Sequence, residues 1–284
     1  MSGLAGLQRR IKIVGQQWNR LLQAVLDERR HARRRSGGNG GGGGSGATDL
    51  LDVLMSLGDL TDDNIKAVIA DMFLGGTETT SITIEWGLAE LLANPHVLKT
   101  LQNDLDVVVG KARLVQEEDV INLPYLQATV KETMRLHPVA PFLMPHQSSQ
   151  VCKVCEYTIP ADTRVLVNVW SIGRDPNVWD NPLQIDPDRF MEKERCSHVN
   201  VRGRHFELLP FGSGKRKCPA LSLGLLTVHI VIASLVQAFE WQLPLSSPLV
   251  DLSEKFGLSF TLASPLCITP SPRIDASKCY QNTI

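Results

Sequence analysis

The alternation of apolar and polar positions predicts helices over the first half of the chain. Residues 5–35 carry apolar side chains at helical spacing, and this segment ends in the basic run RRHARRR at residues 29–35. The basic run is typical of a solvated helix end, and it matches a nucleic-acid-binding patch less well. A second, short helix is expected over residues 49–56, where leucine, valine and methionine supply apolar surface.

A long helix is predicted over residues 62–94, with Thr61 as its N-cap and Asn64 at the third position after it. This helix is apolar over most of its circumference, so we expect it to run through the core. Two further helices are expected at residues 96–109 and 124–136, and the second ends before a His-Pro pair.

The second half of the chain contains short strand-like pieces. Residues 152–175 have β-branched runs broken by Pro-Ala-Asp, which predicts a hairpin, and Pro-rich irregular chain follows to about residue 217. The last long helix is predicted to begin at Pro219, because proline suits the first helical position. Residues 258–262 and 266–270 also resemble strands. The pattern as a whole predicts a mainly α fold with small β elements.

Two segments bear on domain organisation and on membranes. Residues 36–47, SGGNGGGGGSGA, are expected to form a flexible surface loop. No second change of composition follows, so residues 1–284 are expected to belong to a single domain. Residues 221–239 have the length and apolarity of a membrane span, but their polar residues and their position inside the chain favour a buried core helix. Residues 1–7 lack the apolar core of a signal peptide or anchor.

The composition places limits on partners and on redox chemistry. The chain has 284 residues, 43% hydrophobic and 21% charged, and its formal net charge is −1. Such a charge provides no global field that attracts nucleic acid or an anionic membrane. Six cysteines at irregular spacing argue against a disulfide framework and favour a reducing compartment. Cys152 and Cys155 form a lone C-x-x-C without the four ligands of a structural zinc site, so two half-buried thiols beside a turn are the preferred interpretation.

Residues 211–220, FGSGKRKCPA, carry the strongest chemical signal. Two glycines permit backbone conformations closed to other residues and let the chain approach a flat ligand. Cys218 follows near a helix start, where helix N–H groups and the neighbouring cations favour a thiolate. A thiolate is a soft iron ligand, and Arg216 is able to bind a carboxylate bidentately. From the residues alone, a glycine turn beside a buried cysteine explains the segment equally well.

Glu78 and Thr79 lie within GGTETT, residues 75–80, in the middle of the predicted long helix. Adjacent glycines weaken a helix, and a threonine hydroxyl is able to bond to a carbonyl one turn earlier and open the hydrogen-bond ladder. A buried acid and alcohol beside such an opening would hold water and relay protons. A polar patch on a helix surface is the alternative interpretation.

These segments, in this order, resemble the cytochrome P450 family. Phe211, Gly214, Arg216 and Cys218 match its haem-binding signature, and Ala220 stands where glycine is most usual. The resemblance implies a cytochrome P450 fold that is N-terminally truncated, because it covers only the later part of such a protein. It also implies haem b as the cofactor, with Cys218 as the axial ligand of the iron. The residues expected to hold the haem are Phe211, Gly212, Gly214, Arg216, Cys218, Ala220 and His146.

The same resemblance assigns roles to other residues. Glu78 and Thr79 are implied to deliver protons during oxygen activation. His146 falls where relatives place Arg or His near a haem propionate, and a solvent-facing loop histidine is the alternative. An aromatic and aliphatic lining suits an apolar or phenolic small molecule. The residues expected to face the substrate are Phe73, Val139, Ala140, Phe142 and Leu262.

Glu132 and Arg135 stand three residues apart on one face of the helix predicted at residues 124–136. An exposed pair of this kind contributes little stability. The resemblance implies instead a buried Glu-x-x-Arg pair with Arg189 as the third partner, and Asp188 replaces a more frequent Glu beside it. The implied role of these residues is structural, since they hold the region that presents the cysteine loop.

The resemblance implies a haem-thiolate monooxygenase that hydroxylates or oxidises a small apolar or phenolic plant metabolite with O2. Electrons would come from NADPH through NADPH–cytochrome P450 reductase, which would dock near Lys215 and Lys217. Residues 168–176 and 202–210 look like plant microsomal members, with flavonoid and isoflavonoid oxidases such as flavone synthases and flavanone 2-hydroxylases as the nearest group. By this resemblance we expect the cytosolic face of the endoplasmic reticulum membrane as the location, with the family's membrane anchor absent from this chain.

Two alternatives stay open. The first is a truncated, non-catalytic P450 fragment without stable haem. The second keeps the haem but rearranges a peroxide without O2 or reductase. Enzymes of the second kind tend to lack the helix threonine, so Thr79 argues against it.

Overall fold

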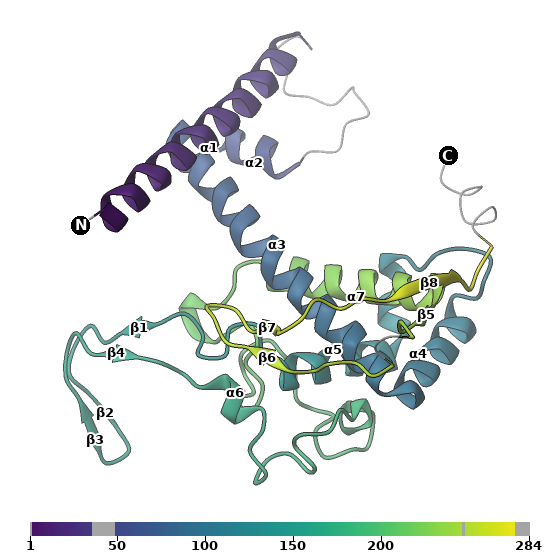
Figure 1. Cartoon of the computed structure of the whole chain (residues 1–284). Helices are drawn as coiled ribbons and strands as arrows, with labels where there is room; N and C mark the ends of the chain where they lie inside the picture. The colour runs from purple at the N-terminus through teal and green to yellow at the C-terminus, as the bar shows by residue number, and fades with distance from the viewer. Residues whose placement is uncertain (1, 36–48, 246–247, 276–284) are drawn as a thin grey trace. The chain divides into compact units, whose positions relative to one another are not determined.

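A computed structural model describes residues 2–35, 49–245 and 248–275, with side chains from residue 6 onward. Its contacts group the chain into two compact units, residues 1–76 and 77–284 (Figure 1). The glycine-rich segment predicted at residues 36–47 lies outside the described residues.

The first unit consists of α1 (Ser2–Arg35), α2 (Leu50–Ser56) and the beginning of α3 (Asp62–Ala93). Its small core is formed by Leu26, Leu54 and Ile65. The predicted cap of α3 is confirmed: the Asn64 N–H donates to Thr61 Oγ1 at 3.2 Å, and the Thr61 N–H donates to Asn64 Oδ1 at 3.1 Å. This reciprocal pair satisfies two backbone donors at the start of the helix.

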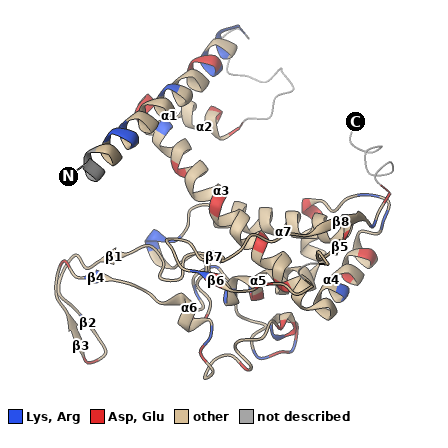
Figure 2. Ribbon diagram, in the orientation of Figure 1, with Lys and Arg blue, Asp and Glu red and all other residues tan. Residues whose placement is uncertain are grey.

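The basic run at the end of α1 is largely exposed, as predicted for a solvated helix end, and its arginines also form ion pairs. Arg29 contacts Asp49 at 2.6 Å and Asp52 at 2.7 Å, and Arg33 contacts Asp52 at 3.1 Å. Arg30 pairs with Asp62 at the first turn of α3. The charged residues of this unit can be followed on the ribbon of Figure 2. The arginines are therefore used to hold three helices together, which the sequence pattern of α1 alone does not reveal.

The second unit is built on helices. The later part of α3 packs with α4 (Pro95–Val108), α5 (Pro124–Leu136) and α7 (Leu221–Ala238) around one large apolar core. A 3-10 helix, η1 (Glu117–Asn122), leads into α5. The helices predicted near residues 96–109 and 124–136 agree with α4 and α5. Gly87 of α3 faces α7, and a Cβ at Gly87 would lie 2.8 Å from the Cδ1 of the fully buried Ile232.

α7 begins at Leu221 and not at Pro219 as predicted. The first helical hydrogen bond runs from the Gly224 N–H to the Ala220 carbonyl at 2.8 Å, so Pro219 lies before the first turn. Val228, Ile232 and Val236 are buried on one face of α7, in agreement with a core helix. By length and composition it is also the one helix among the described residues that matches a membrane span, with a mean hydropathy of 1.9 and 39% of its residues buried.

Within the described residues the strands form four two-stranded antiparallel pairs. Each strand is two to four residues long, as expected for small β elements beside a helical core. The pairs are β1 (His146–Gln147) with β4 (Arg164–Val165), β2 (Cys152–Val154) with β3 (Tyr157–Ile159), β5 (Phe239–Gln242) with β8 (Thr269–Pro272), and β6 (Glu254–Lys255) with β7 (Thr261–Leu262).

The predicted hairpin within residues 152–175 exists, but its turn lies elsewhere. β2 and β3 are joined through Cys155 and Glu156, and Cys155 has a φ of 53°. The Pro-Ala-Asp sequence instead leads from β3 to β4, which pairs with the distant β1. Cys152 and Cys155 are both exposed, so the prediction of half-buried thiols is wrong for these two.

The β-branched run that follows β4 turns into a helix. α6 (Val169–Ile172) begins after Asn168, whose side-chain oxygen accepts from the Ser171 N–H at 3.0 Å. This local cap overrides the β propensity of the segment. Two 3-10 helices complete the unit, η2 (Pro187–Phe190) and η3 (Gly214–Arg216).

Candidate functional site

The cysteine loop lies just before α7. The Cys218 N–H donates to the Phe211 carbonyl at 2.9 Å, which closes the loop upon itself. Gly212 and Gly214 have φ values of 70° and 72°, in the left-handed region that glycine enters without steric cost. The two glycines of the motif are thus required by the backbone.

A third glycine supports this loop from outside. Gly203 has a φ of 78°, and a Cβ there would lie 2.7 Å from the Gly212 carbonyl oxygen. Ser213 Oγ donates to the Gly203 carbonyl at 2.6 Å. The two segments therefore touch backbone to backbone, which the sequence pattern did not reveal because Gly203 lies outside the recognised motif.

The Cys218 side chain is a free, half-buried thiol. Lys215, Arg216 and Lys217 beside it are exposed, so three cations stand next to the sulfur in the chain. The structure places Cys218 three residues before the start of α7. A helix that began at Pro219, as predicted, would have placed Cys218 directly before its first residue.

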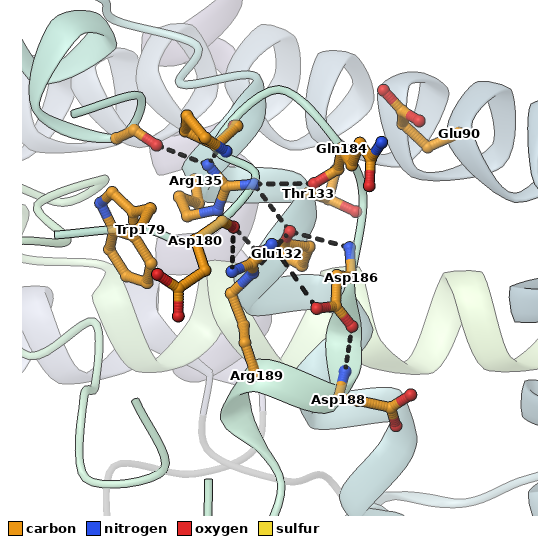
Figure 3. A network of polar contacts seen from close by, with 12 residues as sticks. Glu90, Glu132, Thr133, Arg135, Trp179, Asp180, Gln184, Asp186, Asp188 and Arg189 are labelled. Carbon is orange, nitrogen blue, oxygen red and sulfur yellow. Dashed lines mark hydrogen bonds and ion pairs between the residues drawn. The ribbon is translucent and has the colours of Figure 1, made fainter. Parts of the chain in front are cut away.

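Glu132 and Arg135 form a fully buried ion pair on α5 (Figure 3). Arg135 Nε donates to Glu132 Oε2 at 2.7 Å, and Arg135 Nη2 donates to Glu132 Oε1 at 2.7 Å. Arg135 Nη1 also donates to the Gly173 carbonyl at 2.5 Å. A Cβ at Gly173 would lie 2.4 Å from the Arg135 carbonyl oxygen, so only glycine allows this approach. The interpretation of an exposed surface pair is therefore wrong.

Arg189 of η2 joins the same carboxylate. Its Nε donates to Glu132 Oε1 at 3.0 Å, and its Nη1 donates to the Asp180 carbonyl at 2.9 Å. The Asp186 N–H donates to the same Glu132 oxygen at 2.9 Å, as Figure 3 shows. Asp188 is exposed and stands apart from this carboxylate. Two arginines and one backbone amide thus converge on Glu132 and join η2 to α5.

Glu78 and Thr79 are exposed, so the prediction that they lie buried is wrong for this chain. α3 is helical from Asp62 to Ala93, and the neighbouring glycines do not end it. Thr83 Oγ1 donates to the Thr79 carbonyl at 2.9 Å, which is the predicted kind of back-bonding one turn further along. Glu78 Oε1 accepts from Ser259 Oγ at 3.1 Å. The helices of this unit pack against α3 beyond residue 81, which leaves the acid and alcohol at the surface.

Several of the expected substrate-facing residues come together in the second unit. Leu262 is buried in a cluster with Ile82, Trp86 and Ala89, and Val139 packs against that cluster. Phe142 lies edge-on to Phe256 at a centroid distance of 6.2 Å, and Ala140 is half-buried beside it in the chain. Phe73 belongs to the first unit, where its ring lies edge-on to Trp18 at 6.0 Å. His146 is exposed on β1.

A second buried polar cluster surrounds His137, which follows α5, and sequence reasoning missed it. His137 Nε2 lies 2.6 Å from Glu90 Oε1, and its ring stacks on Trp86 at 3.7 Å. The partners come from α3 and β6, far apart in the chain. The only sequence signal is that a histidine and two glutamates occur in segments otherwise rich in apolar residues. Nothing in the sequence indicates that these three side chains contact one another.

Comparisons with known proteins agree with this architecture. The sequence profile of the cytochrome P450 family matches residues 4–267. The chain is 42% identical over 279 residues to 3,9-dihydroxypterocarpan 6A-monooxygenase of Glycine max, covering 96% of this chain and 54% of that protein. It is 41% identical over 287 residues to flavonoid 3',5'-hydroxylase CYP75B138 of Crocosmia x crocosmiiflora, covering 98% of this chain and 52% of that protein.

The fold is shared with solved structures of the same family. A zebra fish cytochrome P450 determined with progesterone superposes with a TM-score of 0.77 at 32% identity, covering 93% of this chain and 58% of that one. A mainly helical fold and a cysteine loop before its last long helix are what this chain has in common with that family. The chain belongs to the cytochrome P450 family. It spans about half the length of the curated relatives that it matches, 54% and 52% in the two cases above.

The residues around Cys218 fit the haem of this family. The thiol is free and half-buried. A thiolate is a soft ligand suited to iron, and the exposed Arg216 offers a guanidinium for a carboxylate. Cys218 is the residue that would hold the iron, and haem thiolate ligation favours oxygen activation.

Proposed function

We propose that this chain is the haem-binding and oxygen-activating part of a plant haem-thiolate monooxygenase. The supporting observation is the cysteine loop: a free thiol, fixed by a backbone bond from Cys218 to Phe211 and by two glycines with positive φ. Family membership and the names of the relatives support oxidation of a small molecule with O2.

Each residue has a proposed part in this reaction. Cys218 would hold the iron of the haem, and Phe211, Gly212, Gly214 and Ala220 shape the loop that would present this residue. Arg216 and His146 each offer a cation or a hydrogen-bond donor to a propionate. Glu132, Arg135 and Arg189 keep the chain that precedes the loop in place, and this role is structural. When bound, the haem supplies the iron centre at which O2 is activated and an oxygen atom is transferred to substrate.

Protons for that chemistry are proposed to pass through Thr79 and Glu78. The carboxylate of Glu78 already accepts a hydrogen bond from Ser259 at 3.1 Å. A hydroxyl and a carboxylate one residue apart are able to hold a water molecule and transfer its proton. Both side chains are accessible, so bulk water is able to reprotonate them.

The proposed substrate is a small apolar or phenolic plant metabolite, of the flavonoid or pterocarpan kind that the relatives' names indicate. Val139, Ala140, Phe142 and Leu262 would supply an apolar and aromatic lining. We further propose that NADPH–cytochrome P450 reductase delivers the electrons at the cytosolic face of the endoplasmic reticulum. The exposed Lys215 and Lys217 are suited to an acidic docking surface on such a partner.

The test is haem uptake by the purified chain, followed by absorbance of the reduced protein under CO. We expect the band of thiolate-ligated haem, and we expect Cys218→Ala to abolish it. Cys267→Ala is the matched control, because this cysteine is exposed and lies far from the loop in sequence. A band that survives in Cys218→Ala would refute the proposal. Absence of any haem uptake would favour the alternative, a non-catalytic chain without stable haem.

A further inference from the structure

His137 lies between two carboxylates in the interior of the second unit. Its Nε2 is 2.6 Å from Glu90 Oε1 of α3, and its Nδ1 is 3.5 Å from Glu254 Oε1 of β6. The side chains of His137 and Glu90 are only 7% and 8% exposed. The imidazole stacks on Trp86 with an interplanar angle of 3°. One ring thus connects the end of α5 with a helix and a strand.

The imidazole of His137 lies among charged side chains of both signs. Glu254 also accepts from Arg174 Nη2 at 2.8 Å and from Trp170 Nε1 at 3.2 Å. The charged groups facing His137 are therefore Glu90 from α3, Glu254 from β6, and Arg174 beyond Glu254. His137 Nε2 lies within hydrogen-bond distance of Glu90, whereas the contact of Nδ1 with Glu254 is longer, at 3.5 Å.

The strand that carries Glu254 leads into the β6–β7 hairpin, residues 253–263, which rests on the same groups. Trp86 Nε1 donates to the Phe260 carbonyl at 3.1 Å, and the Phe260 N–H donates to the Val139 carbonyl at 2.9 Å. Ser259 near the hairpin tip donates to Glu78 at 3.1 Å. β6 and β7 are two residues long, and so short a pair is not stable by itself. The hairpin therefore depends on these contacts.

The hairpin carries or contacts the residues proposed to face the substrate. Leu262 of β7 is buried against α3, and Phe256 lies edge-on to Phe142 at 6.2 Å and to Phe260 at 5.5 Å. Val139 is hydrogen-bonded to the hairpin and is two residues after His137 in the chain. Anything that shifts the hairpin will therefore shift the proposed lining and the partner of Glu78.

We propose that His137 is a positioning residue: held between Glu90 and Glu254, it fixes the β6–β7 hairpin and through it the residues that line the substrate site. The substrate-site part of this inference rests on the proposed function, whereas the hairpin part does not. Without the imidazole, Glu90 Oε1 loses its partner at 2.6 Å, while Glu254 keeps Arg174 and Trp170. A buried acceptor left without its partner is costly, and β6 and α3 are no longer joined through the ring, so β6 moves away from α3.

The first experiment measures amide hydrogen exchange of the full chain, which requires neither haem nor substrate. His137→Phe keeps an aromatic ring to stack on Trp86 but removes both carboxylate contacts. We expect protection of residues 253–263 to fall about tenfold, equivalent to about 1.4 kcal/mol. Protection of the β5–β8 pair and of α4 should be unchanged. His96→Phe, the same substitution at an exposed histidine of α4, is the matched control and should alter nothing in the hairpin.

Glu254→Gln provides a second variant in case His137→Phe fails to fold. It preserves the shape of the side chain and a carbonyl oxygen for Arg174, and it removes the charge that faces His137. We expect the same loss of protection confined to residues 253–263. Equal loosening of α4 and α5, or no loss in the hairpin, overturns the proposal in either variant.

A pH series gives a readout that a purely steric role would not change. Burial opposes ionisation of Glu254, but its contacts with His137 and Arg174 outweigh this and lower the pKa of Glu254 below its ordinary 4.5. In the unmodified chain, protection of residues 253–263 should therefore be complete above that value and fall as the pH falls below it. In His137→Phe this dependence should be weaker, and an equal dependence in His137→Phe overturns the proposal. Failure of the Cys218 experiment would leave these results unaffected, so the two proposals fail separately.

Discussion

Replacing Glu132 by alanine tests whether the buried network on α5 determines the stability of the second unit. The substitution leaves two buried guanidinium groups, Arg135 and Arg189, without the carboxylate that both contact at 2.7–3.0 Å. It also removes the acceptor of the Asp186 N–H. Removing one partner of a buried ion pair costs about 3–5 kcal/mol.

That loss is large compared with the whole free energy of unfolding, about 5–15 kcal/mol for a typical domain. Arg135 would keep its bonds to the Gly173, Pro182 and Gln184 carbonyls, at 2.5, 2.7 and 3.1 Å, so the loss should not exceed this range. We therefore expect Glu132→Ala to lower the free energy of unfolding by about 3–5 kcal/mol. Urea unfolding followed by far-ultraviolet circular dichroism measures this change.

Asp188→Ala is the matched control, because Asp188 lies on η2 beside Arg189 but its side chain is exposed. An exposed acidic residue of this kind should change the stability by no more than about 0.5 kcal/mol. The reasoning would be refuted if Glu132→Ala cost less than about 1 kcal/mol, since a buried carboxylate that joins two arginines cannot then be important for the fold.

Further expectations concern the loop, a buried histidine and the cysteines. Gly203→Ala should weaken haem uptake and lower the unfolding free energy by about 1–3 kcal/mol, because Gly203 has a positive φ and lies against Gly212; titration with haem and urea unfolding check this. Burial lowers the pKa of His229 below its ordinary 6.5. The neutral ring therefore contributes its full stability above pH 6.5, and this stability is lost as the pH falls from 6.5 toward the lower pKa of the folded state. Thermal unfolding between pH 7 and about pH 5 should therefore depend less on pH in His229→Gln than in the unmodified chain. Burial raises the pKa of Cys196, so maleimide should modify the exposed Cys152, Cys155 and Cys267 well before Cys196. Mass spectrometry of timed samples gives the order of modification, and early modification of Cys196 would contradict this expectation.

The helices could be predicted because their signals are local. The apolar spacing and the cap at Thr61 locate α3 to within a residue, and proline marks the first turns of α4 and α5. The start of α7 was misplaced, because a proline after Cys218 fits a helix start and equally fits the turn that precedes it. Strand pairing was harder to predict, because the paired strands β1 and β4 are not neighbours in the chain.

The candidate site divides in the same way. The cysteine loop could be recognised because glycine, arginine and cysteine occur at fixed spacing within ten residues. The cluster at His137 could not, because Glu90, His137 and Glu254 belong to three elements that only tertiary packing brings together. Burial of Glu78 and Thr79 was also predicted wrongly, because an apolar helix pattern shows which faces are able to be buried but not which neighbours cover them.

Gly87 has a consequence for the geometry between the two helices that carry the proposed chemistry. It is the position where α3, the helix of Glu78 and Thr79, faces Ile232 of α7, the helix that follows Cys218. Glycine at this position has no side chain, so the two helices are able to approach each other closely here. An alanine there would force the buried Ile232 side chain to move or the helix axes to separate. The separation between the two helices near the proposed proton-donating and haem-binding residues thus depends on a residue with no proposed chemical role.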